Sequence, residues 1–83
     1  MKPLPNRPDL DHLKRQAKDL LAAYRSGVAD ALARFRENLP AARSRDDGTI
    51  LAMGFRLHDA QSCIAREYGF VSWPDLKNYI EVT

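Results

Sequence analysis

Few residues of this 83-residue chain have the types and spacing that nucleophilic catalysis uses. A thiol or hydroxyl nucleophile needs an adjacent base, which a third group orients. Cys63 and His58 are five residues apart in a predicted helix, which separates them by about 140° around the helix axis. The two side chains therefore lie on different faces, and we interpret Cys63 as a buried, inert thiol.

The other groups that could do chemistry also lack suitable neighbours. His12 and His58 are expected at the surface or near a helix start, and two separated histidines with one cysteine cannot form a zinc site. Asp46 and Asp47 are the only paired carboxylates, in a segment where turn formation explains them. The sequence contains no glycine-rich phosphate loop. We therefore predict that the protein is not an enzyme and holds no cofactor and no metal.

Positive charge is concentrated in the first half of the chain. Residues 1–45 carry ten Lys or Arg against five Asp or Glu, a net charge of +5, whereas residues 46–83 carry three against six, a net charge of −3. Such asymmetry is typical of a nucleic-acid face or of a partner-binding surface, and it also arises by chance in a short chain. Our candidate contacts to a partner or to nucleic acid are Lys14, Lys18, Arg25, Arg34, Arg36 and Tyr79.

Composition predicts one small globular domain over residues 1–83. The apolar fraction of 45% and the charged fraction of 29% are ordinary for a globular chain. No apolar run approaches the roughly 18 residues of a membrane span, and the N-terminus lacks the apolar region of a signal peptide. We expect a cytoplasmic protein of bacterial type that has no membrane contact.

The apolar spacing predicts an all-α fold, a compact bundle of four to five short helices. Asp9 is a suitable N-cap for a helix over 10–25, and Gly27 ends this helix. Its surface carries a basic stripe of Lys14, Lys18 and Arg25, which is either solvated or in contact with a partner. The other elements are an extended arm over 1–8, a helix over 28–38 with Val28 inward, a surface loop over 40–48, and a core-plugging short helix or turn over 49–55. The expected core residues are Leu13, Leu20, Phe35, Ile64, Phe70, Trp73 and Leu76.

Residues 59–77 predict a helical hairpin that is similar to a helix-turn-helix. A helix over 57–68 ends at Gly69, and a capping box at Ser72 begins a helix over 73–82. A DNA reader and a plain hairpin are both built this way. The second helix carries acidic residues beside one Lys and one Asn, which is a weak set for phosphates and base edges.

Aromatic residues offer a second kind of contact surface. Trp73, Tyr24, Tyr79 and Phe55 are the candidates for a partly exposed apolar patch, which would mark a partner site. The alternative for Trp73 is a packing role beneath the hairpin, because it follows the turn at the start of the last helix.

Two segments resemble a known bacterial helical module. They are Leu13-Lys14-Arg15-Gln16-Ala17-Lys18-Asp19-Leu20-Leu21, and the stretch from Asp59-Ala60-Gln61 through Ala65-Arg66-Glu67-Tyr68-Gly69-Phe70 to Ser72-Trp73 and Leu76-Lys77. The module usually stands at the N-terminus of ankyrin-repeat proteins or beside glyoxalase-like domains. The resemblance covers residues 4–39 and 57–80, and the chain departs from it in the insert-like stretch 41–56 and in having no following repeats. It implies no catalytic residues, and it implies protein contact only by association.

We therefore expect a non-catalytic binding or regulatory protein that acts through protein–protein contacts. It would be an adaptor or inhibitor of a larger protein partner, or it would self-associate. The alternative is a small DNA-associated transcriptional regulator with a degenerate helix-turn-helix. A third class is an accessory domain for an enzyme whose chemistry lies on another chain.

Overall fold

The computed structural model describes residues 9–82, so the predicted arm over 1–8 lies outside the described residues. This part of the chain is all-α, as predicted, and has no strand. Its elements are α1 (Leu10–Arg25), α2 (Ala29–Asn38), the 3-10 turn η1 (Pro40–Ala42), α3 (Asp47–Ala52), α4 (Leu57–Glu67) and α5 (Trp73–Val82).

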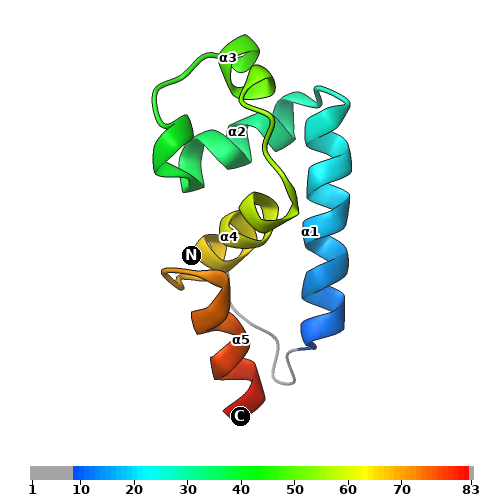
Figure 1. Cartoon of the computed structure of the whole chain (residues 1–83), viewed down its shortest axis with the longest axis vertical. Helices are drawn as coiled ribbons and strands as arrows, with labels where there is room; N and C mark the ends of the chain where they lie inside the picture. The colour runs from blue at the N-terminus through cyan, green and yellow to red at the C-terminus, as the bar shows by residue number, and fades with distance from the viewer. Residues whose placement is uncertain (1–8, 83) are drawn as a thin grey trace.

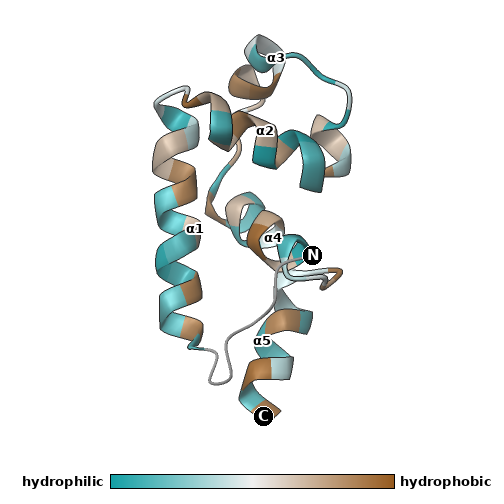
Figure 2. Cartoon of the chain, turned by 180° about the vertical axis from the view of Figure 1, so that it is seen from behind, coloured by the Kyte–Doolittle hydropathy of each residue, from teal (hydrophilic) through white to brown (hydrophobic). Residues whose placement is uncertain are grey.

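The helices form an elongated bundle (Figure 1). The long helix α1 runs along one side, α2 and α3 form one end, and α5 extends at the other end. Helix α4 packs against α1, α2 and α5, so it joins the two ends. The apolar residues of α1 lie on the side that faces α2 and α4 (Figure 2). None of the helices in the described part is long and apolar enough to cross a membrane.

The predicted ends of α1 are confirmed. The Asp9 side chain accepts a hydrogen bond from the amide of Asp11 at 2.9 Å, which caps the first turn. Gly27 follows the last turn with a φ of 72°, a left-handed conformation that favours glycine. The inward prediction for Val28 is wrong, because this residue is the N-cap of α2 and its side chain is exposed.

The segment 40–48 lies at the surface as predicted, except at Ala42, but it is not a loop throughout. Pro40–Ala42 form a 3-10 turn whose Ala42 is fully buried, and α3 already begins at Asp47. The plug predicted over 49–55 is present in part. Ile50 and Phe55 are buried, whereas Leu51 and Met53 are exposed, because a single short helix can turn only one face to the core.

The hairpin is formed largely as predicted. Helix α4 ends one residue before the predicted end, at Glu67, and Gly69 follows with a φ of 89°. The hydroxyl of Ser72 accepts from the amide of Asp75 at 3.4 Å, at the start of α5. Within α5, Leu76 is the one buried residue, and the helix packs on α4.

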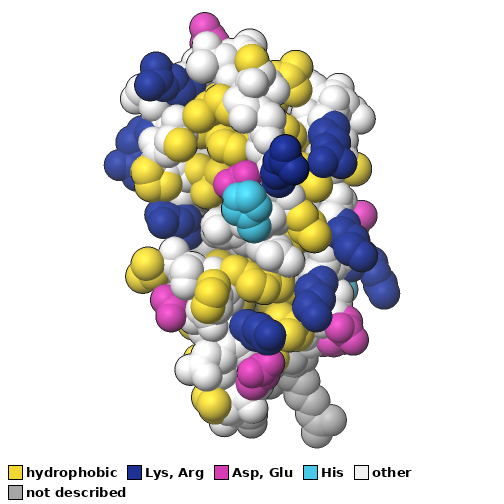
Figure 3. Space-filling model, viewed as in Figure 1, with side chains coloured by type: hydrophobic (Ala, Val, Ile, Leu, Met, Phe, Trp, Pro, Cys, Tyr) yellow, Lys and Arg dark blue, Asp and Glu magenta, His cyan; other side chains and the backbone are white. Residues whose placement is uncertain are grey.

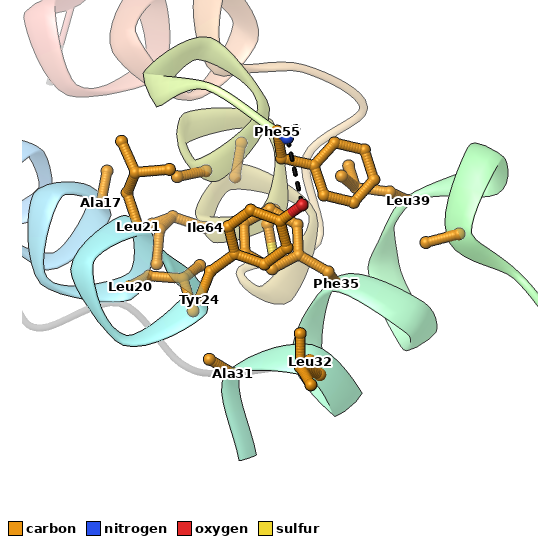
Figure 4. Packing of buried hydrophobic residues seen from close by; sticks show 14 of the residues in the cluster. Ala17, Leu20, Leu21, Tyr24, Ala31, Leu32, Phe35, Leu39, Phe55 and Ile64 are labelled. Atoms are coloured by element: carbon orange, nitrogen blue, oxygen red, sulfur yellow. Dashed lines mark hydrogen bonds between the residues drawn. The ribbon is translucent and has the colours of Figure 1, made fainter. Parts of the chain in front are cut away.

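The hydrophobic core lies where α1, α2 and α4 meet (Figure 4). Five predicted core residues are buried there: Leu13, Leu20, Phe35, Ile64 and Leu76. The other two, Phe70 and Trp73, are only partly buried and pack against the edge of the core. They lie at the start of α5 and just before it, and this helix packs on α4 at one end of the bundle. Tyr24 and Phe55, which the sequence offered as surface aromatics, are 2% and 8% exposed, so that prediction is wrong for both.

Candidate functional site

The exposed face of α1 carries four cationic side chains: Lys14, Arg15, Lys18 and Arg25. Lys14, Lys18 and Arg25 recur at a spacing that places them within about 40° of one another around the helix. None of the four forms an ion pair with another described residue. Lys and Arg side chains are accordingly seen along the edge of the molecule that α1 forms (Figure 3). We call these four residues the basic face.

Arg34 is not part of this surface, although the sequence suggested it. Its Nε and Nη2 donate to the two carboxylate oxygens of Glu67, each at 2.7 Å. Glu67 is only 9% exposed, and the hydrogen bond to it raises the pKa of the Arg34 guanidinium. The pair joins α2 to α4, so Arg34 has a structural role and its charge is already neutralised.

Arg36 is also occupied within the fold. Its Nε donates to the backbone carbonyl of Arg45 at 2.7 Å, and its Nη2 forms an ion pair with Asp47. These contacts hold the segment between η1 and α3 against α2. Charge reversal of Arg34 or Arg36 would therefore test folding rather than binding.

The start of α3 gives a prediction about pH. The Asp46 carboxylate accepts from Thr49, whose amide lies 2.7 Å away, and these hydrogen bonds lower the pKa of Asp46. The ionised cap therefore contributes stability above about pH 4 and loses it as the pH falls through the lower folded-state pKa. Because Asn caps a helix without titrating, Asp46→Asn should flatten this part of the stability profile.

The measurement for this prediction is the midpoint of urea unfolding at pH 5.5, 4 and 2.5. Asp19→Asn is the matched control, because it removes an exposed carboxylate that caps no helix. Equal profiles for Asp46→Asn, Asp19→Asn and the unmodified chain would contradict the assignment.

Tyr79 is exposed, at 46%, and its ring lies 5.3 Å from that of Phe70. It belongs to the surface of α5 and not to the basic face. The rest of the exposed side of α5 is poorly suited to DNA. Lys77 pairs with Glu81 at 3.9 Å, and Asp75 adds a further acidic side chain.

A hollow of about 520 Å³ lies beside the C-terminal end of α1. It is lined by Tyr24, Arg25, Leu51, Gly54, Phe55 and Arg56. The lining brings the end of α1 together with the linker between α3 and α4. Arg56 has no ion pair with the other described residues, and Leu51 is 43% exposed.

The hydroxyl of Tyr24 fixes the floor of this hollow. Its oxygen lies 2.6 Å from the carbonyl of Ile50 and 3.0 Å from that of Leu51, so it donates to the end of α3. The same oxygen accepts from the amide of Phe55 at 3.2 Å (Figure 4). One side chain of α1 is therefore hydrogen-bonded both to α3 and to the linker that follows it.

The aromatic rings beneath the hollow form a compact cluster. The ring centroids of Phe35 lie 4.9 Å from those of both Tyr24 and Phe55, and the latter two lie 5.4 Å apart. Contacts of this length are favourable beyond the area they bury. The residues beneath the hollow are therefore packed side chains of the core.

The residues that could do chemistry are not brought together. Cys63 is fully buried, as predicted, and its Sγ lies 3.5 Å from the carbonyl of Arg34. His58 is exposed, with Nε2 3.4 Å from Asp59, and His12 is exposed on α1. Among residues 9–82, no group of three His, Cys, Asp or Glu side chains could hold a metal ion.

The sequence did not identify the hollow. Leu51, Gly54 and Arg56 lie in the stretch that we interpreted as a core plug and linker, far along the chain from the end of α1. One available signal was Arg56, an unpaired cation just before a helix in the otherwise acidic half of the chain. Comparison of the chain with protein-family models, with curated proteins and with solved structures gave no match.

Proposed function

We propose that this is a non-catalytic binding protein that docks an acidic protein surface on the basic face of α1. The observation that carries the proposal is the contrast between two sets of cations. Arg34 and Arg36 are paired with Glu67 and Asp47, whereas Lys14, Arg15, Lys18 and Arg25 are exposed and lack ion pairs among the described residues. A cluster of unpaired charge attracts partners of opposite sign and speeds their association.

A protein partner suits this surface better than nucleic acid. Asp11 and Asp19 interrupt the basic face, and both are exposed. With Arg34 and Arg36 removed from the set, few phosphate contacts remain. Leu51 and Met53 are exposed apolar side chains, and protein interfaces combine such apolar surface with charged groups. The role we propose is that of an adaptor or inhibitor of a larger protein, in line with the protein contact that the resemblance implies by association.

The test is affinity capture from the native host with the tagged full chain. We expect one stoichiometric protein, lost with Lys14→Glu combined with Lys18→Glu and retained with Arg43→Glu combined with Arg45→Glu. The control pair makes the same change of charge at exposed side chains away from α1. Recovery of chaperones alone would contradict the proposal.

A mobility-shift titration with duplex and single-stranded DNA separates the two classes of partner. We expect no shift at low salt. A shift that weakens steeply with salt and is lost in the Lys14→Glu, Lys18→Glu variant would instead assign the basic face to nucleic acid.

A further inference from the structure

We infer that the hollow beside Arg25 and Arg56 receives a short acidic segment of the partner that carries one large apolar side chain. This inference rests on the proposed function and specifies where the partner docks and what chemistry is recognised. It follows from the lining of the hollow, from its charge, and from its position at the end of the basic face.

Leu51 is the apolar side chain that the hollow exposes, and the floor beneath it is fixed. Tyr24 and Phe55 lie in this floor with only 2% and 8% of their surface exposed, and the Tyr24 hydroxyl contacts the backbone of α3 and of Phe55. Leu51 stands at the side with 43% of its surface exposed. Since a volume of about 520 Å³ lies within the range of ligand sites, the hollow has room for a Leu or Phe side chain with part of its backbone.

The rim of the hollow is positively charged. Arg25 and Arg56 are both exposed, no Asp or Glu belongs to the lining, and neither arginine is paired with another described residue. The Asp59 carboxylate lies beside the rim, where it accepts from the amide of Arg56 at 2.8 Å, but it forms no ion pair with either guanidinium group. Two guanidinium groups without an ion pair among the described residues favour carboxylates, which they bind in planar, charge-assisted pairs.

Another hollow in the described part of the chain has a different charge. It measures about 250 Å³, lies between α1 and α2, and includes Asp19 and Asp30 in its lining. Its one cation is Arg34, which is paired with Glu67. An acidic segment would therefore be repelled there, so of these two hollows the one at Arg25 and Arg56 is complementary to it.

The position of the hollow sets the length of the segment. Arg25 belongs both to the basic face and to the lining, so a chain that crosses Lys14 and Lys18 reaches the hollow at the end of α1. Eleven residues of helix from Lys14 to Arg25 rise about 16 Å. An extended strand covers that distance in about five residues. We therefore assign acidic residues along α1 followed by an apolar anchor at the hollow.

The test is a titration of the full chain, followed by two-dimensional 15N–1H NMR, with the peptide Glu-Glu-Ser-Glu-Glu-Ser-Phe-Glu. We expect the largest shifts at the amides of Leu51, Gly54, Phe55 and Arg56. Peptides with Lys in place of every Glu, or Ser in place of Phe, should bind at least tenfold more weakly. Equal binding of the Ser-substituted peptide, shifts centred elsewhere, or no shifts at millimolar peptide would overturn the inference.

Variants locate the contact. Arg25→Glu combined with Arg56→Glu should weaken peptide binding at least tenfold, and Leu51→Ser about fivefold. The matched controls are Arg43→Glu combined with Arg45→Glu for charge, and Val71→Ser for an exposed apolar residue. Thermal unfolding of each variant checks that it is folded. Peptide binding that depends on Lys14 and Lys18 but not on Arg25, Arg56 or Leu51 would reject this site and leave the proposed function standing. If the unmodified tagged chain captures no partner from the native host, both the site and the proposed function are rejected.

Discussion

Phe35→Ala is expected to lower the free energy of unfolding by about 4 kcal/mol. Phe35 is fully buried, and its ring contacts those of Tyr24 and Phe55, with its centroid 4.9 Å from each. Truncation removes buried apolar surface and leaves a cavity that three helices cannot close at once. A domain of this size has a total stability of roughly 4–12 kcal/mol, so the variant should be close to unfolding.

Urea unfolding followed by circular dichroism measures this effect. Val71→Ala is the control, because its side chain is 73% exposed and surface changes usually stay within about 0.5 kcal/mol. Phe35→Leu should recover part of the loss by refilling some of the space. A loss below about 1.5 kcal/mol in Phe35→Ala would contradict the central role that we give the aromatic cluster.

The parts of the fold that were predicted from the sequence depend on local signals. The ends of α1 are set by the Asp9 cap and by Gly27, and the end of α4 by Gly69. Each signal acts within a few residues of the end that it marks. Periodicity likewise identified Leu13, Leu20 and Ile64 as core residues, because helical spacing alone defines a buried face.

The predictions are incomplete or wrong where contacts between residues far apart in the sequence determine which side chains are buried or paired. Segment 40–48 was predicted as a surface loop from its polar composition, and it is exposed except at Ala42; the buried Ala42 and the hydrogen bond from Arg36 to the carbonyl of Arg45 were not predicted. Arg34 was predicted at a contact surface because the sequence does not show its partner. Glu67 is 33 residues away along the chain and reaches Arg34 only when the chain is folded. The apolar stretch 49–55 gave no indication that Leu51 would be left exposed.

The candidate site shows the same division. Lys14, Lys18 and Arg25 could be predicted as a stripe, since one helix determines their relative positions. The hollow could not be predicted, because Arg25 and Arg56 are far apart in the sequence. They line the same hollow only when the α3–α4 linker packs on α1. That docking depends in part on the Tyr24 hydroxyl, and no spacing rule distinguishes this residue from an ordinary aromatic residue on an apolar face.

This dependence leads to a second large effect, expected for Tyr24→Phe. The substitution keeps the ring in the cluster but removes the atom that contacts Ile50 and Phe55. A buried polar group that loses its partner costs about 1–3 kcal/mol. Water from the adjoining hollow can reach part of the linker, which reduces this cost. We therefore expect a loss of about 2 kcal/mol by urea unfolding, with faster amide exchange at Phe55.

The same variant links stability to binding. If the Tyr24 hydroxyl preforms the hollow, Tyr24→Phe should weaken binding of the acidic peptide, because the linker must then be ordered during association. Leu51→Ala is the stability control, since it alters an exposed side chain of the same segment and leaves the carbonyl in place; we expect it to cost less than 1 kcal/mol. An unchanged amide exchange rate at Phe55 in Tyr24→Phe would show that the linker is held by packing of Ile50 and Phe55 alone. The hollow would then owe its shape to the apolar core, and not to the hydrogen bonds of Tyr24.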